Sequence, residues 1–168
     1  VFSRLREDPD VDQNIVLVNI GNLSRREIAQ QVQIVSKYKP KVIGIDAFFD
    51  CPRGSDTISC PALRDTFGNL LFSSAIQNAA NVVLVSKVLR SDTLLPVNTY
   101  DSLRRSDPMF RDFAIAEGYA SLDSDAKFQD DVKICRFFNP VVPIKGKDHY
   151  AFGVELAMIY DSAKTRNF

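Results

Sequence analysis

The sequence has no long apolar run and no net charge. None of its hydrophobic stretches approaches the roughly 20 residues that a transmembrane helix needs, and residues 1–10 lack the charged, apolar and small-residue regions of a signal peptide. The 21 Lys and Arg residues balance the 21 Asp and Glu residues, so we expect no nucleic-acid partner. The chain as it stands is expected to be soluble. It begins with Val1 and not with Met, so we expect it to be part of a longer protein.

The sequence also lacks a glycine-rich loop after its first apolar run and a C-x-x-C pair, and it has only one histidine. The turn after residues 14–20 reads IGNLSRRE with one glycine, which excludes a dinucleotide-binding turn or a P-loop at that position. The single histidine, His149, is expected in a solvated turn, and one histidine does not build a multi-histidine metal site. Three cysteines without C-x-x-C spacing do not form a zinc site. We therefore expect no cofactor, no metal ion and no catalytic residue.

The sequence does contain a clear strand–helix alternation. Residues 14–20 (NIVLVNI), 41–49 (KVIGIDAFF) and 81–89 (NVVLVSKVL) are short apolar runs typical of strands buried on both faces. Two helical patterns separate them, the first opened by an S-x-x-E capping box at Ser24 and Glu27 and the second ending near Ala80. With 168 residues, 45% of them hydrophobic, the chain is expected to form one domain over residues 1–168.

The second half of the chain is less regular. Residues 90–108 are expected to be mostly loop, and a short helix near residues 109–116 is expected to end at Gly118, before a fourth strand. Residues 131–144 alternate as in an antiparallel strand pair, GKDH (residues 146–149) predicts a turn, and the closing segment predicts a helix. The fold class is therefore α/β, with a central, mostly parallel sheet flanked by helices and a late antiparallel strand pair.

Two acidic residues lie at the carboxyl end of the second predicted strand, Asp46 within it and Asp50 directly after it. Asp46 is expected within that strand near its carboxyl end, where open α/β sheets bind ligands. A divalent cation held by Asp46 and Asp50, with Asp56 or Asp65 helping, would suit a hydrolase or a phosphoryl-transfer enzyme. The alternative is that Asp46 accepts hydrogen bonds from the backbone of a neighbouring turn. We favour that alternative, because the partner residues of a receiver or phosphatase site are absent.

Two cysteines enclose the polar loop that comes next. Cys51 and Cys60 flank PRGSDTIS, which has few apolar residues with which to order itself by burial. A disulfide closing such a loop is worth about 2–3 kcal/mol in the chain-entropy model. In an oxidising compartment this is the natural pair, with Cys135 left as a strand thiol, whereas in a reducing cytosol all three remain thiols. The arginines lie between carboxylates and are expected on solvated faces; they include Arg25, Arg26, Arg104 and Arg105.

Taken in order, these segments resemble the second type of CHASE domain, a sensory extracellular module of cyclases, histidine kinases and other bacterial signalling proteins. The resemblance covers nearly the whole chain. It is carried by NIVLVNI, KPKVIGIDAFF, NAANVVLVSKV, GYASLDSDAKFQDDVKICRFF and YAFGVELAMIYD. The family's acidic turn after the first strand is replaced here by NIGNLS, and the glycine of its D-x-D-G turn is absent. The residues that match family positions are Asp46, Phe49, Gly118, Asp125 and Arg136.

The resemblance implies a noncatalytic sensor domain outside the cytoplasmic membrane. Flanking transmembrane helices and a cytoplasmic output domain, such as a cyclase, histidine kinase or serine/threonine kinase, would belong to the full-length protein. An oxidising exterior strengthens the expectation of the disulfide between Cys51 and Cys60. We expect a small-molecule or surface ligand near Asp46, Asp50 and Arg136, and a homodimer is compatible with the resemblance. Two alternatives remain open: the cytosolic metal-dependent enzyme, and a cell-surface interaction domain without a small-molecule ligand.

Overall fold

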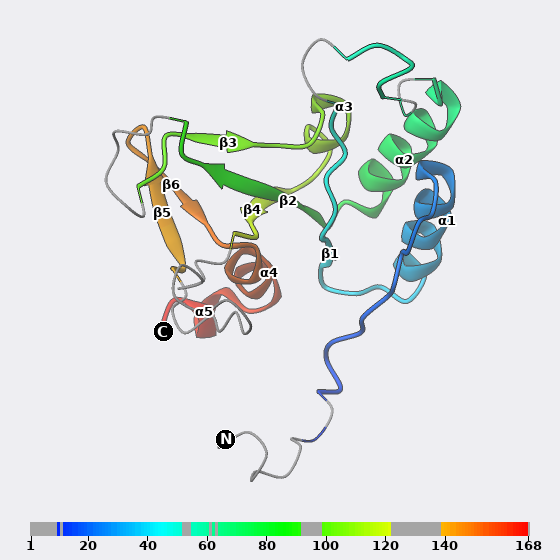
Figure 1. The fold of residues 1–168 in the computed structure, drawn as a ribbon. Coiled ribbons are helices and arrows are strands. Elements are labelled where there is room, and N and C mark those ends of the chain that lie inside the picture. The colour runs from blue at the N-terminus through cyan, green and yellow to red at the C-terminus, as the bar shows by residue number, and fades with distance from the viewer. Residues whose placement is uncertain are drawn as a thin grey trace, which may run out of the picture.

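The computed structural model describes residues 10, 12–51, 55–60, 62, 64–91, 99–121 and 139–167. Within these ranges the helices and strands form an α/β fold, with helices on both faces of a small sheet (Figure 1). None of the helices in these ranges has the length and apolar character needed to cross a bilayer. The fold class predicted from the sequence is therefore confirmed.

The main sheet is built around one long central strand. β2 (Val82–Leu89) pairs in parallel with β1 (Ile43–Ile45) and with β4 (Ala116–Tyr119). Its last residues pair antiparallel with β3 (Ser102–Arg104). The first four residues of β2 have no exposed surface, because helices pack on both faces of this strand. The continuous apolar run that predicted a doubly buried strand therefore describes β2 correctly.

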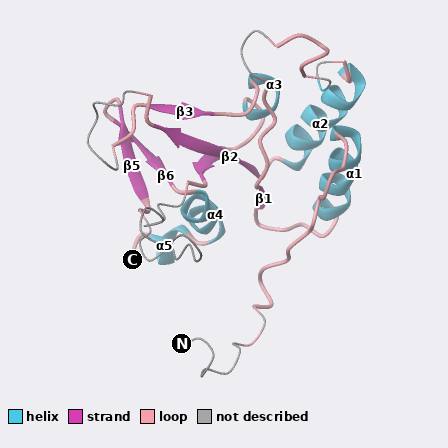
Figure 2. Ribbon diagram, in the orientation of Figure 1, coloured by secondary structure: helices cyan, strands magenta, loops and turns pink. Residues whose placement is uncertain are grey.

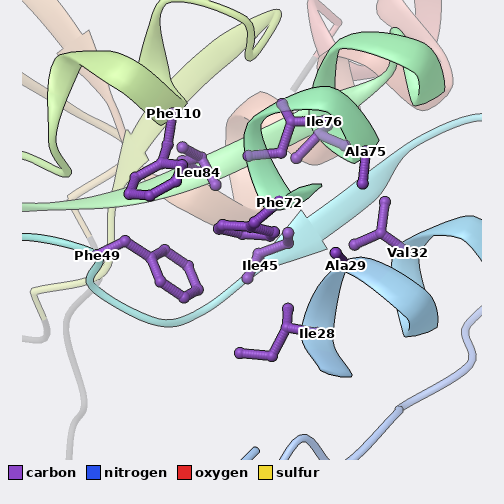
Figure 3. Packing of buried hydrophobic residues seen from close by; sticks show 11 residues of the cluster. Ile28, Ala29, Val32, Ile45, Phe49, Phe72, Ala75, Ile76, Leu84 and Phe110 are labelled. Carbon is purple, nitrogen blue, oxygen red and sulfur yellow. The ribbon is translucent and has the colours of Figure 1, made fainter. Parts of the chain in front are cut away.

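One face of the sheet packs against two helices. α1 (Arg25–Ser36) begins at the predicted capping box: the Ser24 N–H donates to Glu27 Oε2 at 2.7 Å. α2 (Thr66–Ala79) packs along α1. Figure 3 shows side chains from both helices meeting those of β1 and β2. The members of this core are Ile28, Ala29, Val32, Ile45, Phe49, Phe72, Ala75, Ile76, Val82, Leu84 and Phe110.

The opposite face of the sheet packs against α4 (Phe152–Tyr160), which is followed by α5 (Ser162–Thr165). Two glycines allow this close approach. A Cβ atom on Gly118 would lie 2.4 Å from the Cα atom of Phe152, and one on Gly44 would lie 2.9 Å from Leu156 Cδ1. Gly118 was predicted to end a helix, but it lies inside β4, and the helix before it, α3 (Pro108–Arg111), ends earlier. The absence of a side chain at Gly118 lets α4 pack closely against β4. A local sequence pattern does not reveal such a contact, because α4 is distant in the sequence.

The late antiparallel pair forms a separate two-stranded sheet. β5 (Val141–Ile144) pairs with β6 (Lys147–Tyr150) through a turn at Lys145 and Gly146, both of which have positive φ (Figure 2). The predicted turn at residues 146–149 is therefore too long, because residues 147–149 already belong to β6. Residues 131–138, predicted as part of this pair, lie outside the described residues. A parallel bridge between Tyr119 and Ala151 joins the hairpin to the main sheet.

The predicted first strand is wrong. Residues 14–20 are neither strand nor helix, and Ile15, Val16 and Leu17 are 64%, 82% and 92% exposed. Only the end of the segment reaches the core, where Ile20 packs against it. An apolar run has the composition of a buried strand, but a strand also needs a hydrogen-bonding neighbour, and within the described ranges this segment pairs with none. The region predicted as loop after Leu89 likewise contains a strand, β3.

Replacing Gly118 with alanine is expected to destabilise the fold by about 1–3 kcal/mol, because the added methyl group meets the backbone of α4. Gly153 is the matched control, since a Cβ atom there has no neighbour within 4 Å and alanine is the better helix former. Urea denaturation of both variants measures the difference. Equal stability of the Gly118→Ala and Gly153→Ala variants would contradict the close packing of α4 on β4.

Candidate functional site

The candidate site is the segment that follows β1, from Asp46 to Cys60. It leaves the carboxyl end of a parallel strand, the edge at which open α/β sheets bind ligands. Asp46 is the first residue after β1 and is exposed, so it lies just beyond the strand in which it was predicted. None of the described residues donates a hydrogen bond to Asp46. The backbone-capping role predicted for this carboxylate is therefore not seen, and its oxygens are open to solvent.

Phe49 anchors this segment to the core. Its ring centroid lies 4.6 Å from that of Phe72 and 5.9 Å from that of Phe110, and Phe49 is only 6% exposed (Figure 3). Its backbone is held as well: the Phe49 N–H donates to Ser106 Oγ at 3.2 Å, and the Asp107 N–H donates to the Phe49 carbonyl at 2.9 Å. These contacts fix Phe49 relative to α2 and α3, and with it the nearby Asp46 and Asp50.

Asp50 forms a bidentate ion pair with Arg104. Arg104, at the end of β3, donates from Nε to Asp50 Oδ2 at 2.8 Å and from Nη2 to Oδ1 at 3.0 Å. The hydrogen bond and the charge of Asp50 raise the pKa of Arg104. The Arg104 guanidinium also lies 5.3 Å from the ring centroid of Phe48. Both carboxylate oxygens of Asp50 thus accept hydrogen bonds from Arg104, and these bonds hold the segment against β3.

A disulfide closes the rest of the segment. Cys51 and Cys60, the pair named from the sequence, are bonded, with their Cα atoms 6.0 Å apart. Asp56 organises the turn between them, because its Oδ1 accepts hydrogen bonds from the N–H groups of Ile58 and Ser59. These bonds lower the pKa of the Asp56 carboxyl, with those from Ser59 contributing most. A segment with little apolar content is therefore held by a covalent bond and by local polar contacts.

Arg25 links this region to the two main helices. It is the first residue of α1, and its Nη1 donates to Asn69 Oδ1 and, at 3.4 Å, to the Ala62 carbonyl. Its guanidinium lies 5.0 Å from the ring centroid of Phe110. Burial lowers the pKa of Arg25, and the charges of Asp107, Asp65 and Asp50 only partly oppose that effect. The prediction of a solvated Arg25 is therefore wrong.

A usable signal for Arg25 was present in the sequence. It lies three residues before Ile28, and residues three apart share a helix face, so Arg25 is on the face of α1 that packs against the core. The even distribution of arginines among carboxylates gave no indication that Arg25 would be partly buried. Arg26, Arg104 and Arg105 are exposed, as predicted, although Arg104 pairs with Asp50 and Arg105 pairs with the carboxylate of Glu117.

The acidic residues proposed for a divalent cation do not come together. Asp50 is bound to Arg104, Asp56 organises its own turn, and Asp65 caps α2 by accepting from the Gly68 N–H at 2.8 Å. In the part of the chain that the structure describes, no three His, Cys, Asp or Glu side chains form a metal-binding group. Asp46 and Asp56 are both exposed, but only Asp46 lacks a hydrogen-bond partner among the described residues, so it is the carboxylate that the segment offers to a ligand.

Four other predictions concern residues elsewhere. Arg136, Asp125 and Cys135 lie outside the described residues, so their expected roles stay predictions. His149 was expected in a solvated turn, but it lies in β6 and is partly buried. The hairpin turn is two residues long, and the strand therefore reaches this histidine.

Replacing Arg25 with glutamine is expected to lower the free energy of unfolding by about 1–3 kcal/mol, because the buried Asn69 amide and the Ala62 carbonyl lose a charged donor. Arg26 is the matched control: it too stacks on a phenylalanine, Phe67, but it is exposed, so Arg26→Gln is expected to change stability by less than about 0.5 kcal/mol. Urea denaturation compares the two. Equal losses would contradict the bracing role of Arg25.

Comparisons with known proteins identify the family. The CHASE2 domain family matches residues 2–167, essentially the whole chain. Neither a curated protein nor a solved structure matches the sequence of this chain. CHASE2 domains are sensory extracellular domains of signalling proteins. The resemblance noted from the strand and helix segments is thereby confirmed, and the chain belongs to the CHASE2 domain family.

Proposed function

We propose that this chain is the noncatalytic, extracytoplasmic input domain of a bacterial transmembrane signalling protein. The observation that carries the proposal is the family match over residues 2–167. On this proposal the domain, spanning residues 1–168, sits between transmembrane helices of an inner or cytoplasmic membrane protein. It passes a ligand-dependent change to a cytoplasmic cyclase, histidine kinase or serine/threonine kinase. A sensor of this kind needs different ligand affinities in two conformations, and it needs no reaction.

The disulfide supports an oxidising location. Bonds such as that between Cys51 and Cys60 form and persist outside the cytoplasm and are rare within it. The enclosed loop has few buried side chains: of its described residues only Cys60 is buried. The described part of the loop is therefore held by this bond and by the hydrogen bonds to Asp56, and a reducing compartment would remove the bond.

The segment after β1 is the proposed ligand-binding region. Asp46 presents a solvent-accessible carboxylate at the carboxyl edge of the sheet. Asp50 lies on the same segment, where its pairing with Arg104 shapes the loop. Arg136, from the sequence analysis, is proposed as a further contact. The ligand in this proposal is a small molecule or a surface group that bonds to the Asp46 carboxylate.

Thiol counting tests the compartment. Protein made in the bacterial periplasm and denatured without reductant is expected to react with one equivalent of a maleimide per chain, because two of its three cysteines are bonded. After reduction the count is expected to rise to three. Mass spectrometry measures the number of maleimide labels per chain before and after reduction. Three reactive thiols before reduction would contradict the extracytoplasmic assignment.

Substitution of Asp46 tests the ligand region. In the full-length protein, Asp46→Ala is expected to abolish or strongly reduce the response of the output domain to its stimulus. The melting temperature of the isolated chain should stay within about 2 °C, since the carboxylate is exposed. Asp10→Ala is the control, because Asp10 is an exposed aspartate outside this segment. An unchanged response in the Asp46 variant, with the fold intact, would remove the segment as the binding region.

A further inference from the structure

An exposed apolar segment precedes α1. Residues 15–18 read IVLV, and their side chains are 64%, 82%, 92% and 49% exposed in chain order. Figure 1 shows this part of the chain lying outside the sheet. Consecutive apolar residues in water are unfavourable, and the β-branched Ile and Val residues in this run favour a strand. We call residues 14–19 the strap. The strap has the composition of a strand but no partner strand among the described residues.

β1 has an unused edge. One edge of β1 pairs with β2, and no described strand pairs with the other. The Ile43 N–H donates to the Asn81 carbonyl at 3.0 Å, on the side of β2. Because backbone groups alternate along a strand, the N–H and carbonyl of Gly44 point to the free edge, and Gly44 is exposed. An unpaired strand edge of this kind is a template for a further strand.

The space beside β1 lies between two apolar layers. Ile43 and Ile45 pack against the core of α1 and α2, whereas Gly44 lies against Leu156 of α4. None of the side chains of α4 is fully buried, although the helix is almost wholly apolar. A strand next to β1 would present alternate side chains to these two layers, and all of residues 15–18 are apolar. The strap therefore matches the free edge of β1 on both faces.

The two ends of the strap are already held near the two ends of β1. Asn14 Oδ1 accepts a hydrogen bond from the Tyr160 hydroxyl at 3.4 Å, and the Tyr160 ring lies 4.6 Å from the ammonium group of Lys41, which precedes β1. Ile20 packs against the same core as Ala47, which follows β1. The stretch from Asn14 to Ile20 and the stretch from Lys41 to Ala47 thus run in the same direction over the same number of residues.

We propose that the strap closes onto the free edge of β1 as a parallel strand of the main sheet, and that the described conformation is its open state. The strap, α1 and β1 then form a strand–helix–strand crossover, the usual connection between parallel neighbours. The occupant of the edge is the strap of the same chain and not that of a second copy, because its two ends already lie at this edge. Pairing within one chain loses no freedom of association.

Closing also changes the candidate ligand site. With Asn14 aligned to Lys41, the closed strap places Asn19 beside Asp46 at the carboxyl edge of the sheet. A ligand bonded to the Asp46 carboxylate would meet the Asn19 amide in the closed state only, so it would favour closing. This coupling rests on the proposed function. The closing itself does not, because it is a property of the isolated chain.

Hydrogen exchange of the isolated chain, measured by NMR, tests the closing. The amide of Gly44 and alternate amides of residues 15–19 are expected to exchange at least about tenfold more slowly than their intrinsic rates, because strand pairing protects them. Exchange of these amides at the intrinsic rate would overturn the proposal. Protection that increases with protein concentration would show pairing between copies, and it would equally overturn closing within one chain.

Substitution of Leu17 gives a second test. Leu17 is 92% exposed in the open state, so Leu17→Gln has no effect on a strap that never closes. If the strap closes, this variant is expected to lower the melting temperature by about 3–6 °C and to reduce the protection of Gly44, since the buried leucine is lost. Ile58→Gln is the matched control: Ile58 is 77% exposed and lies outside the strap, so its melting temperature should stay within about 1 °C.

Equal melting temperatures of the Leu17→Gln and wild-type chains would contradict the closed state. Such a failure would leave the sensor proposal intact, since thiol counting tests that proposal separately.

Discussion

The contact among Phe49, Phe72 and Phe110 is the constraint on which the candidate site depends. These rings come from the segment after β1, from α2 and from α3, and their centroids lie 4.6 to 5.9 Å apart. Each is at most 6% exposed. Such packing joins three separate parts of the chain, so a polar loop that would otherwise be mobile starts from a fixed point. The Arg104–Asp50 ion pair and the disulfide extend this order along the loop.

β2 positions the strand that leads into the candidate ligand loop. It pairs in parallel with β1, and its first four residues have no exposed surface. On its other edge it pairs in parallel with β4, whose Gly118 lets α4 pack against the sheet. The loop therefore starts from a strand whose neighbour is packed on both faces.

Residue patterns predicted the elements whose order is local. The capping box predicted the start of α1, and the apolar run predicted β2. The polar loop between two cysteines indicated the disulfide pair. The failures arose where a partner distant in sequence decides the outcome. Residues 14–20 lack a pairing strand among the described residues, Gly118 serves contact with α4, and Arg25 is enclosed by α2 and Phe110. The family resemblance supplied the basis for the proposed function, which composition and spacing alone did not.

The central claim is that this domain folds and works outside the cytoplasmic membrane. Limited proteolysis of intact spheroplasts that carry the full-length protein tests it most directly, with an antibody against this domain as the readout. The account predicts that externally added protease removes the domain while a cytoplasmic marker protein stays whole. Survival of the domain until the membrane is lysed, followed by its digestion together with the marker, would contradict it.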